Sequence, residues 1–465
     1  MYKEKFSMNR SVKRYVSGPG GILELLVIAM PMVISQACET VMLFTDRLFL
    51  SHLSPTHMAA SMSGGLTAFM CMTFFIGLTG YTTPLVAQYF GAGQEKKCAV
   101  VVTQAVIISG AAYPLMLASI PIGHWLFQIV GHSEEQQELA QIYFDILMLG
   151  TLLGIVRNSL NGFFCGIGKT RIVMVSSLIT MTINVVVNYM LILGKGGFPV
   201  MGIRGAAIGT IIGSASGLMV VIVGYILYHR SHRKFEISGS LCFDWHIMKK
   251  LLRFGYPGGL EFFFNLLAFD LIVLLFHSYS LEVAASVTIA LNWDLASFIP
   301  LIGVNIGVTS LVGRYMGAHL PDNADRTTQS GLILVSVYAV FMLGLFVLFP
   351  QPLVSLFLSE AEKAKDFAGL AEYMVRMIAV YVIADGFALV YSGALRGAGD
   401  TFWAMVISVS FHWLLAAEAV VMIRVLHLSP KISWTVVVFS IPLIATAFYL
   451  RYRSGKWRQL KVVGI

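Results

Sequence analysis

The sequence contains little charge and no cysteine pattern of a metal or redox site. Only 12% of its 465 residues are charged, against about 25% in soluble domains. Its five cysteines form no CxxC pair, so we expect free thiols, no metal site and no cofactor. HExxH and GxSxG motifs are missing too, and we therefore expect a protein without catalytic residues.

What the sequence does contain is apolar surface. Hydrophobic residues make up 57% of the chain, and the mean hydropathy is +0.78. A soluble fold of this length could not bury so much, so lipid must be the solvent. A spanning helix needs about 20 apolar residues, and roughly twelve such stretches can be placed along the chain. The alternation of a membrane β-barrel is missing. The predicted fold class is therefore an all-α integral membrane protein.

The net charge of +8 does not point to nucleic acid, because the basic residues do not form one patch. Most of them lie on alternate loops between the apolar stretches, which is the positive-inside pattern. This pattern predicts that both termini are cytoplasmic, in the inner or plasma membrane. The basic segments His229–Lys234 and Arg451–Lys461 are then expected to contact anionic lipid.

The chain repeats itself. Three pairs of segments match in order at a nearly constant offset: Pro31 with Pro257, Thr83–Ala92 with Thr309–Ala318, and Gly166–Thr170 with Gly397–Thr401. Each half contains six apolar stretches, an even number, so the halves have the same orientation in the membrane. Two similar lobes that can enclose a cavity are typical of transporters that rock between two states.

The repeat predicts the organisation of the domains. We expect a cytoplasmic tail over residues 1–21 and a first six-helix lobe over 22–228. A cytoplasmic linker over 229–250, a second lobe over 251–451 and a tail over 452–465 follow. One chain supplies both lobes, so we expect a monomer.

Polar residues inside the first lobe's spans are candidates for function, because an ionisable side chain there costs about 2.5–3.5 kcal/mol to insert. Glu39 and Asp46 lie two helical turns apart on one face of the first helix. Asn184 and Asn188 lie one turn apart on the fifth helix, and Thr210 begins the sixth. Carboxylate, amide and hydroxyl oxygens suit a hard cation such as sodium. The alternative is interhelical hydrogen bonding.

The second lobe carries further in-span polar residues. Glu261 and Asn265 lie one turn apart on the seventh helix. Asp294 on the eighth helix and Asp385 on the tenth could form a proton relay with them, since buried carboxyl groups can titrate near neutral pH. The alternative for Asp270 and Asp385 is ion pairing with Arg157 or Arg376. Aromatic residues such as Phe264 can contact an organic cation, although packing is their more common role.

Several of these segments together resemble the multidrug and toxic compound extrusion (MATE) family of transporters. They are Val86–Gly93, the Gly166–Thr170 turn followed by Asn184 and Asn188, Gly205–Thr210, and Gly393–Thr401. The likeness extends from about Leu25 to Leu450. It implies twelve helices in two lobes and export of organic compounds against sodium or proton entry.

The resemblance also assigns residues. In the first lobe, the family's helix-one acid falls on Asp46, grouped with Asn184, Asn188 and Thr210. In the second lobe, the tenth-helix acid falls on Asp385, but the seventh-helix acid position is Asn265, which cannot titrate. Glu261, one turn away, is a possible replacement. Glu39 occupies the position equivalent to Asn265 in the first lobe, which departs from the family pattern.

The sequence thus predicts an antiporter that works by alternating access. Its expected cation or proton sites are Asp46, Glu39, Asn184, Asn188, Thr210, Glu261, Asn265, Asp294 and Asp385, and its expected cavity residues are Glu39, Glu261, Phe264 and Asp385. Because acids dominate, we expect a small cationic or zwitterionic organic substrate. The alternative is a flippase of lipid-linked precursors from the same broad superfamily.

Overall fold

The computed structural model describes residues 16–129, 133–231, 241–358 and 366–463. Most of the basic N-terminal tail and half of the His229–Lys234 segment lie outside them. The described residues form helices and no strand. The helices of the first half are α2 (Ile22–Ser51), α3 (Pro55–Gly80), α4 (Thr82–Gly91), α5 (Glu95–Ala118), α6 (Ile120–Ile129), α7 (Glu134–Gly166), α8 (Arg171–Leu193) and α9 (Ile203–Ser231).

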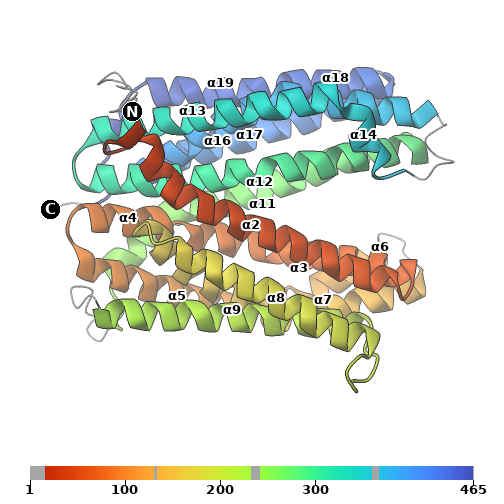
Figure 1. Ribbon diagram of the computed structural model, residues 1–465, viewed down its shortest axis with the longest axis horizontal. Coiled ribbons are helices and arrows are strands. Elements are labelled where there is room, and N and C mark those ends of the chain that lie inside the picture. The colour runs from red at the N-terminus through yellow and green to blue at the C-terminus, as the bar shows by residue number, and fades with distance from the viewer. Residues whose placement is uncertain (1–15, 130–132, 232–240, 359–365, 464–465) are drawn as a thin grey trace, which may run out of the picture. The chain divides into compact units, whose positions relative to one another are not determined.

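The second half repeats this order. Its helices are α11 (Trp245–His277), α12 (Leu281–Gly317), α13 (Pro321–Leu348), α14 (Pro350–Ser355), α16 (Asp366–Ala398), α17 (Thr401–Val420), η2 (Val421–Val425), α18 (Pro430–Ser440), α19 (Pro442–Arg453) and η3 (Lys456–Gln459). Within each bundle the long helices run side by side (Figure 1). Twelve helical segments of the described residues are long and apolar enough to cross a membrane, which confirms the all-α fold of about twelve spans.

Local sequence signals set the ends of these helices. Ser54 precedes Pro55, and its hydroxyl accepts a hydrogen bond from the His57 backbone N–H at 3.2 Å. Ser280 caps α12 in the same way, accepting from Val283 at 3.2 Å. Helix α8 ends at Gly194, whose φ of 66° favours glycine. These caps satisfy backbone groups that lipid could not.

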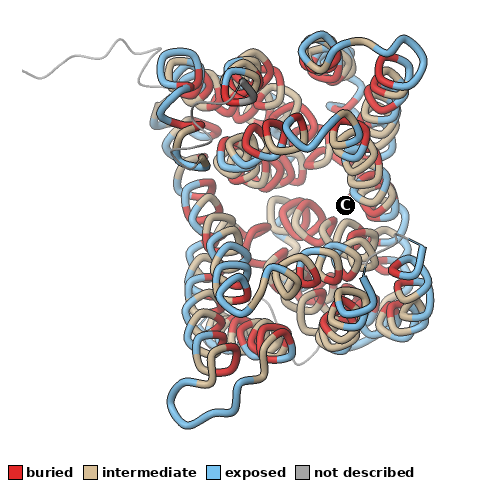
Figure 2. Tube along the Cα trace, turned by 90° about the vertical axis from the view of Figure 1, so that its right-hand side faces the viewer, coloured by how far each residue is buried: buried red, intermediate tan, exposed pale blue. Residues whose placement is uncertain are grey.

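The chain divides into two compact units that do not coincide with the two repeats. Unit 1 consists of residues 1–33 and 264–465, and unit 2 of residues 34–263. The first part of α2 therefore packs with the second repeat, and the first part of α11 packs with the first repeat. Within each unit, buried positions face neighbouring helices of the same bundle (Figure 2).

Equivalent close contacts hold these two exchanged half-helices. In unit 1, a side chain at Gly303 of α12 would overlap Val33 of α2. In unit 2, a side chain at Gly77 of α3 would overlap Gly258 of α11. Gly77 and Gly303 occupy equivalent positions of the two repeats, at the offset that relates Pro31 to Pro257. The same backbone-to-backbone packing has thus been kept in both halves, and small residues make it possible.

Polar contacts fix the same half-helices nearer their N-terminal ends. Glu24 accepts a 2.6 Å hydrogen bond from the Tyr315 hydroxyl in unit 1. In unit 2, Lys250 donates to the Tyr89 hydroxyl at 3.4 Å. Glu24 is equivalent to Lys250 in the repeat, as Tyr89 is to Tyr315. The two halves therefore use the same pair of positions with opposite charge.

Candidate functional site

A buried carboxylate lies within the membrane-spanning part of unit 2. This carboxylate belongs to Asp46 of α2, which is 5% exposed. Asn184 and Asn188 of α8 are both fully buried beside it. Thr210 of α9 completes the group. The structure thus brings together four of the five residues that the sequence singled out in this lobe, all except Glu39.

Hydrogen bonds connect the four side chains. Asn188 donates from Nδ2 to Asp46 Oδ1 and to Asn184 Oδ1, the latter at 3.3 Å. Thr210 Oγ1 lies 3.4 Å from Asp46 Oδ2. Asn184 Nδ2 in turn lies 3.4 Å from the Thr210 hydroxyl. The carboxylate therefore receives its polar contacts from neutral donors on two other helices.

One oxygen of this cluster is not used. Asn188 Oδ1 is buried and has no hydrogen-bond partner among the described residues. It lies against Gly209, where a β-carbon would overlap it. Turning the Asn188 amide about its last bond would exchange nitrogen and oxygen and present the oxygen toward Asp46. The cluster would then offer carboxylate, amide and hydroxyl oxygens, the ligand type that hard cations prefer.

Glu39 has a partner of its own. Its Oε1 is 3.0 Å from Arg157 Nη2 on α7, and Arg157 Nη1 is 3.3 Å from the Thr180 hydroxyl. The Glu39 side chain is 44% exposed, whereas that of Arg157 is 13% exposed. The negative charge of Glu39 is thus balanced by the positive charge of Arg157 inside the span. The part of the Glu39 carboxylate that faces away from Arg157 remains exposed.

The two polar residues of α11 belong to different units. Glu261 is 3% exposed and lies in unit 2, whereas Asn265 lies in unit 1. Asn265 donates to the Ser408 hydroxyl of α17 at 2.8 Å, and its own Oδ1 is buried without a hydrogen-bond partner in the part of the chain that the structure describes. One helical turn therefore separates two residues with different surroundings.

A second acidic pair lies within unit 1. Asp294 of α12 and Asp385 of α16 interact electrostatically, and Tyr381 lies within hydrogen-bonding reach of Asp294. Both acids are partly exposed. Phe264, also in unit 1, is 36% exposed. Arg376 pairs with Glu372 at 3.8 Å and not with Asp385.

Two side chains in these clusters had no role in the sequence prediction. Thr180, which holds the Arg157 guanidinium, is one of many hydroxyls in spans and carries no distinguishing signal. Tyr381 lies one turn before Asp385, and that spacing could have indicated it. Among the described residues, no group of three or more His, Cys, Asp or Glu side chains could hold a metal ion.

Comparison with known proteins agrees with this architecture. The MatE family profile matches twice, over residues 31–190 and 257–417, which is more than half of the chain. The two matches start at equivalent positions of the internal repeat, Pro31 and Pro257. A probable multidrug resistance protein NorM of Thermotoga maritima is 26% identical, covering 95% of this chain and 94% of that protein. Multidrug resistance protein MdtK of Yersinia pestis is 28% identical over 84% and 85%.

Solved structures show the same fold. The outward-facing conformation of a multidrug resistance MATE family transporter superposes with a TM-score of 0.86 at 19% identity, covering 98% of this chain and 100% of that one. A MATE structure in complex with MaL6 gives 0.85, again at 19% identity, over 97% and 100%. Twelve spans and these relatives establish a multi-pass protein of the plasma membrane, and a transporter rather than an enzyme. With the family profile matched in both halves, the chain belongs to the MATE family of transporters.

Proposed function

We propose that this transporter exports small organic compounds in exchange for sodium ions or protons. The observation that carries the proposal is the Asp46 cluster, a carboxylate buried among amide and hydroxyl groups within a span. A proton or a cation there would neutralise a charge that is costly to keep in lipid. The names of the relatives, multidrug resistance proteins, support organic compounds as the cargo.

Coupling follows from differential affinity. An ion that binds Asp46 more tightly in one conformation than in the other shifts the equilibrium toward the first. Substrate that prefers the second conformation is then displaced, and the two affinities change reciprocally. In this proposal the Asn188 amide responds directly to ion binding. Without an ion it donates a hydrogen bond to Asp46, and with a cation bound it would turn its oxygen toward the cation.

The charges of the spans favour a cationic or zwitterionic substrate. Asp294 and Asp385 are partly exposed acids in unit 1, and Phe264 supplies an exposed ring in the same unit. In unit 2, the open face of Glu39 can accept an ammonium group, while Arg157 limits the excess of negative charge. A ring face and a carboxylate are the groups that bind an organic cation.

Transport by purified protein in liposomes tests the proposal. A fluorescent organic cation is loaded, and a sodium gradient or a pH gradient is imposed separately. We expect one gradient to drive efflux and Asp46→Asn to abolish the coupled efflux. Asp270→Asn is the matched control, because Asp270 is a partly exposed in-span acid with no hydrogen bond or ion pair to another described residue.

The outcomes distinguish the alternatives. Efflux driven by the sodium gradient alone would identify sodium as the coupling ion, and efflux driven by the pH gradient alone would identify the proton. Undiminished coupling in Asp46→Asn would refute the role given to Asp46. Absence of efflux under both gradients would favour the flippase of lipid-linked precursors instead.

A further inference from the structure

A groove of about 340 Å³ opens in unit 1, and none of the acids discussed above lines it. Its walls come from the first turns of α13, from α16, from the last turns of α19 and from η3. Its lining is part aromatic and part polar, with Tyr391, Tyr449 and Trp457 among the aromatic side chains and Asp325, Arg453 and Arg458 among the polar ones.

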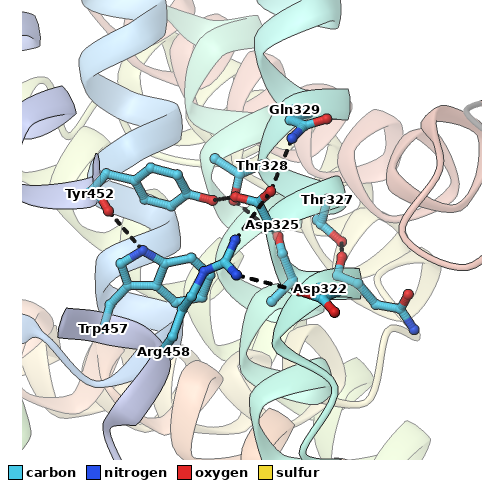
Figure 3. Close-up of polar contacts among 10 residues, drawn as sticks. Asp322, Asp325, Thr327, Thr328, Gln329, Tyr452, Trp457 and Arg458 are labelled. Atoms are coloured by element: carbon cyan, nitrogen blue, oxygen red, sulfur yellow. Dashed lines mark hydrogen bonds and ion pairs between the residues drawn. The ribbon is translucent and has the colours of Figure 1, made fainter. Parts of the chain in front are cut away.

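Asp325 is the centre of the polar wall (Figure 3). The Tyr452 hydroxyl donates to its Oδ1 at 2.6 Å, and Gln329 Nε2 donates to its Oδ2 at 3.0 Å. Arg458 Nη2 lies 3.4 Å from the same Oδ2. Both oxygens of the carboxylate are therefore bonded to protein donors, and Arg458 balances its negative charge.

The C-terminal segment forms one wall of the groove. Trp457, which is 1% exposed, anchors this segment to unit 1. The Trp457 ring stacks on Tyr452, with centroids 5.0 Å apart and planes at 19°. Its Nε1 donates to the Tyr452 carbonyl at 3.0 Å. Arg458 lies 5.3 Å from the centre of the Trp457 ring. This packing builds η3 into the wall, so the groove is part of the folded unit.

Unsatisfied donors face this groove. Arg453 is exposed and makes no hydrogen bond or ion pair with another described residue. The hydroxyls of Tyr391 and Tyr449 likewise make no hydrogen bond to a described residue, and their rings lie 5.7 Å apart. The groove therefore offers a guanidinium and two hydroxyls but no free acceptor charge, which is complementary to an anion.

The position of the groove matches the headgroup layer of a membrane. Helix α13 begins at Pro321 and α19 ends at Arg453, so both walls are helix ends. Tyrosine and tryptophan gather at this depth in membrane proteins. Leu332 and Tyr449, which also line the groove, lie further along α13 and α19, away from these helix ends. The basic loops make this the cytoplasmic leaflet in our topology, the leaflet that carries anionic lipids.

The equivalent end of unit 2 contains a larger aromatic cluster. Phe163 packs edge-on against Tyr225 at 4.9 Å, and Phe164 packs against Tyr228 at 6.4 Å. At the offset that relates Gly166 to Gly397, the positions of this phenylalanine pair are taken by Ala394 and Leu395 in unit 1. The two repeats therefore differ in aromatic content at this end.

We propose that this groove binds the headgroup of an anionic phospholipid, with its phosphate on Arg453 and its upper acyl chain against Leu332. Asp325 acts indirectly, since it holds Tyr452 and Arg458 in place. The site is independent of the Asp46 cluster and of the transport reaction, and it would fix the end of α19 and the C-terminal segment to the bilayer.

Native mass spectrometry of the delipidated full chain tests the proposal. Phosphatidylglycerol and phosphatidylethanolamine with identical acyl chains are added in separate titrations. We expect tighter binding of phosphatidylglycerol, and roughly fivefold or greater weakening in Arg453→Ala, the effect of one arginine at a charged membrane surface. Arg171→Ala is the matched control, because Arg171 is also exposed, at the first turn of α8, and does not line the groove.

A second variant removes the space without changing charge. Leu332→Trp should fill the groove and weaken phosphatidylglycerol binding while the lipid-free protein keeps its melting temperature. Equal binding by wild type, Arg453→Ala and Leu332→Trp would overturn the proposal. Complete competition by soluble glycerol phosphate would overturn it too, because a free phosphate ester would then be the ligand.

Discussion

Replacing Gly209 with alanine is expected to disrupt the Asp46 cluster without touching a polar residue. The added β-carbon would overlap the Asn188 side-chain oxygen, which has no room to remain where it is. Asn188 is fully buried and donates to both Asp46 and Asn184. Its amide must therefore move away from Asp46, and the side-chain oxygen that it would present to a bound cation moves with it.

The size of the effect follows from the loss of the Asn188 oxygen as a ligand of the bound cation. A polar contact to a charged group contributes about 1.5–3 kcal/mol. The ion-free state also loses the Asn188 hydrogen bond to Asp46, which offsets part of this loss. A net loss of about 1–2 kcal/mol corresponds to a roughly five- to thirtyfold weaker affinity for the coupling cation.

The assay is the concentration of coupling cation that gives half-maximal efflux from liposomes. Gly110→Ala is the control, since a β-carbon at Gly110 meets nothing within 4 Å. We expect the half-maximal concentration to rise in Gly209→Ala and to stay unchanged in Gly110→Ala. If both variants match the wild type, the Asn188 amide has no part in cation binding and the reasoning fails.

Two further predictions concern contacts inside the units. Arg157→Gln should lower the free energy of unfolding by about 1–3 kcal/mol, which is less than the loss expected for a fully buried ion pair because Glu39 is partly exposed. In thermal melts, adding Glu39→Gln should restore at least half of the lost stability. A double variant that is less stable than Arg157→Gln would contradict the pairing. Tyr315→Phe removes the short hydrogen bond to Glu24, and Tyr89→Phe removes the 3.4 Å hydrogen bond from Lys250. Amide hydrogen exchange at the start of α2 should therefore accelerate more in Tyr315→Phe than exchange at the start of α11 does in Tyr89→Phe. Equal acceleration would show that these hydrogen bonds do not hold the half-helices.

Much of the fold could be predicted because lipid imposes simple rules. Continuous apolar stretches mark spans, and repeated motifs such as Thr83–Ala92 and Thr309–Ala318 mark the two halves. The Asp46 cluster was predictable for a similar reason. A one-turn spacing places Asn184 and Asn188 on one face of α8, and few polar residues exist in these spans to serve as their partners.

Contacts that depend on tertiary packing could not be predicted. Nothing in the sequence pairs Glu39 with Arg157, which are far apart along the chain. Nor does spacing separate Glu261 from Asn265, since both lie on one helix one turn apart. The one-turn spacing makes Glu261 a candidate to replace the acid that the family pattern expects at the position of Asn265. The division of α11 between two units gives these positions different neighbours, and periodicity within one helix contains no information about that.

The exchange of half-helices bears on how such a chain could have arisen by duplication. A single repeat folded alone would lack the half-helix that covers Gly77 or Gly303, because in each unit that cover comes from the other repeat. Two separate copies could each complete the packing of the other by exchanging their first half-helices, as the two repeats do here. The ancestor that this arrangement implies is a domain-swapped dimer, and fusion of its two copies into one chain preserved the exchange. The opposite charges of Glu24 and Lys250, at equivalent positions, show that the two copies have since diverged.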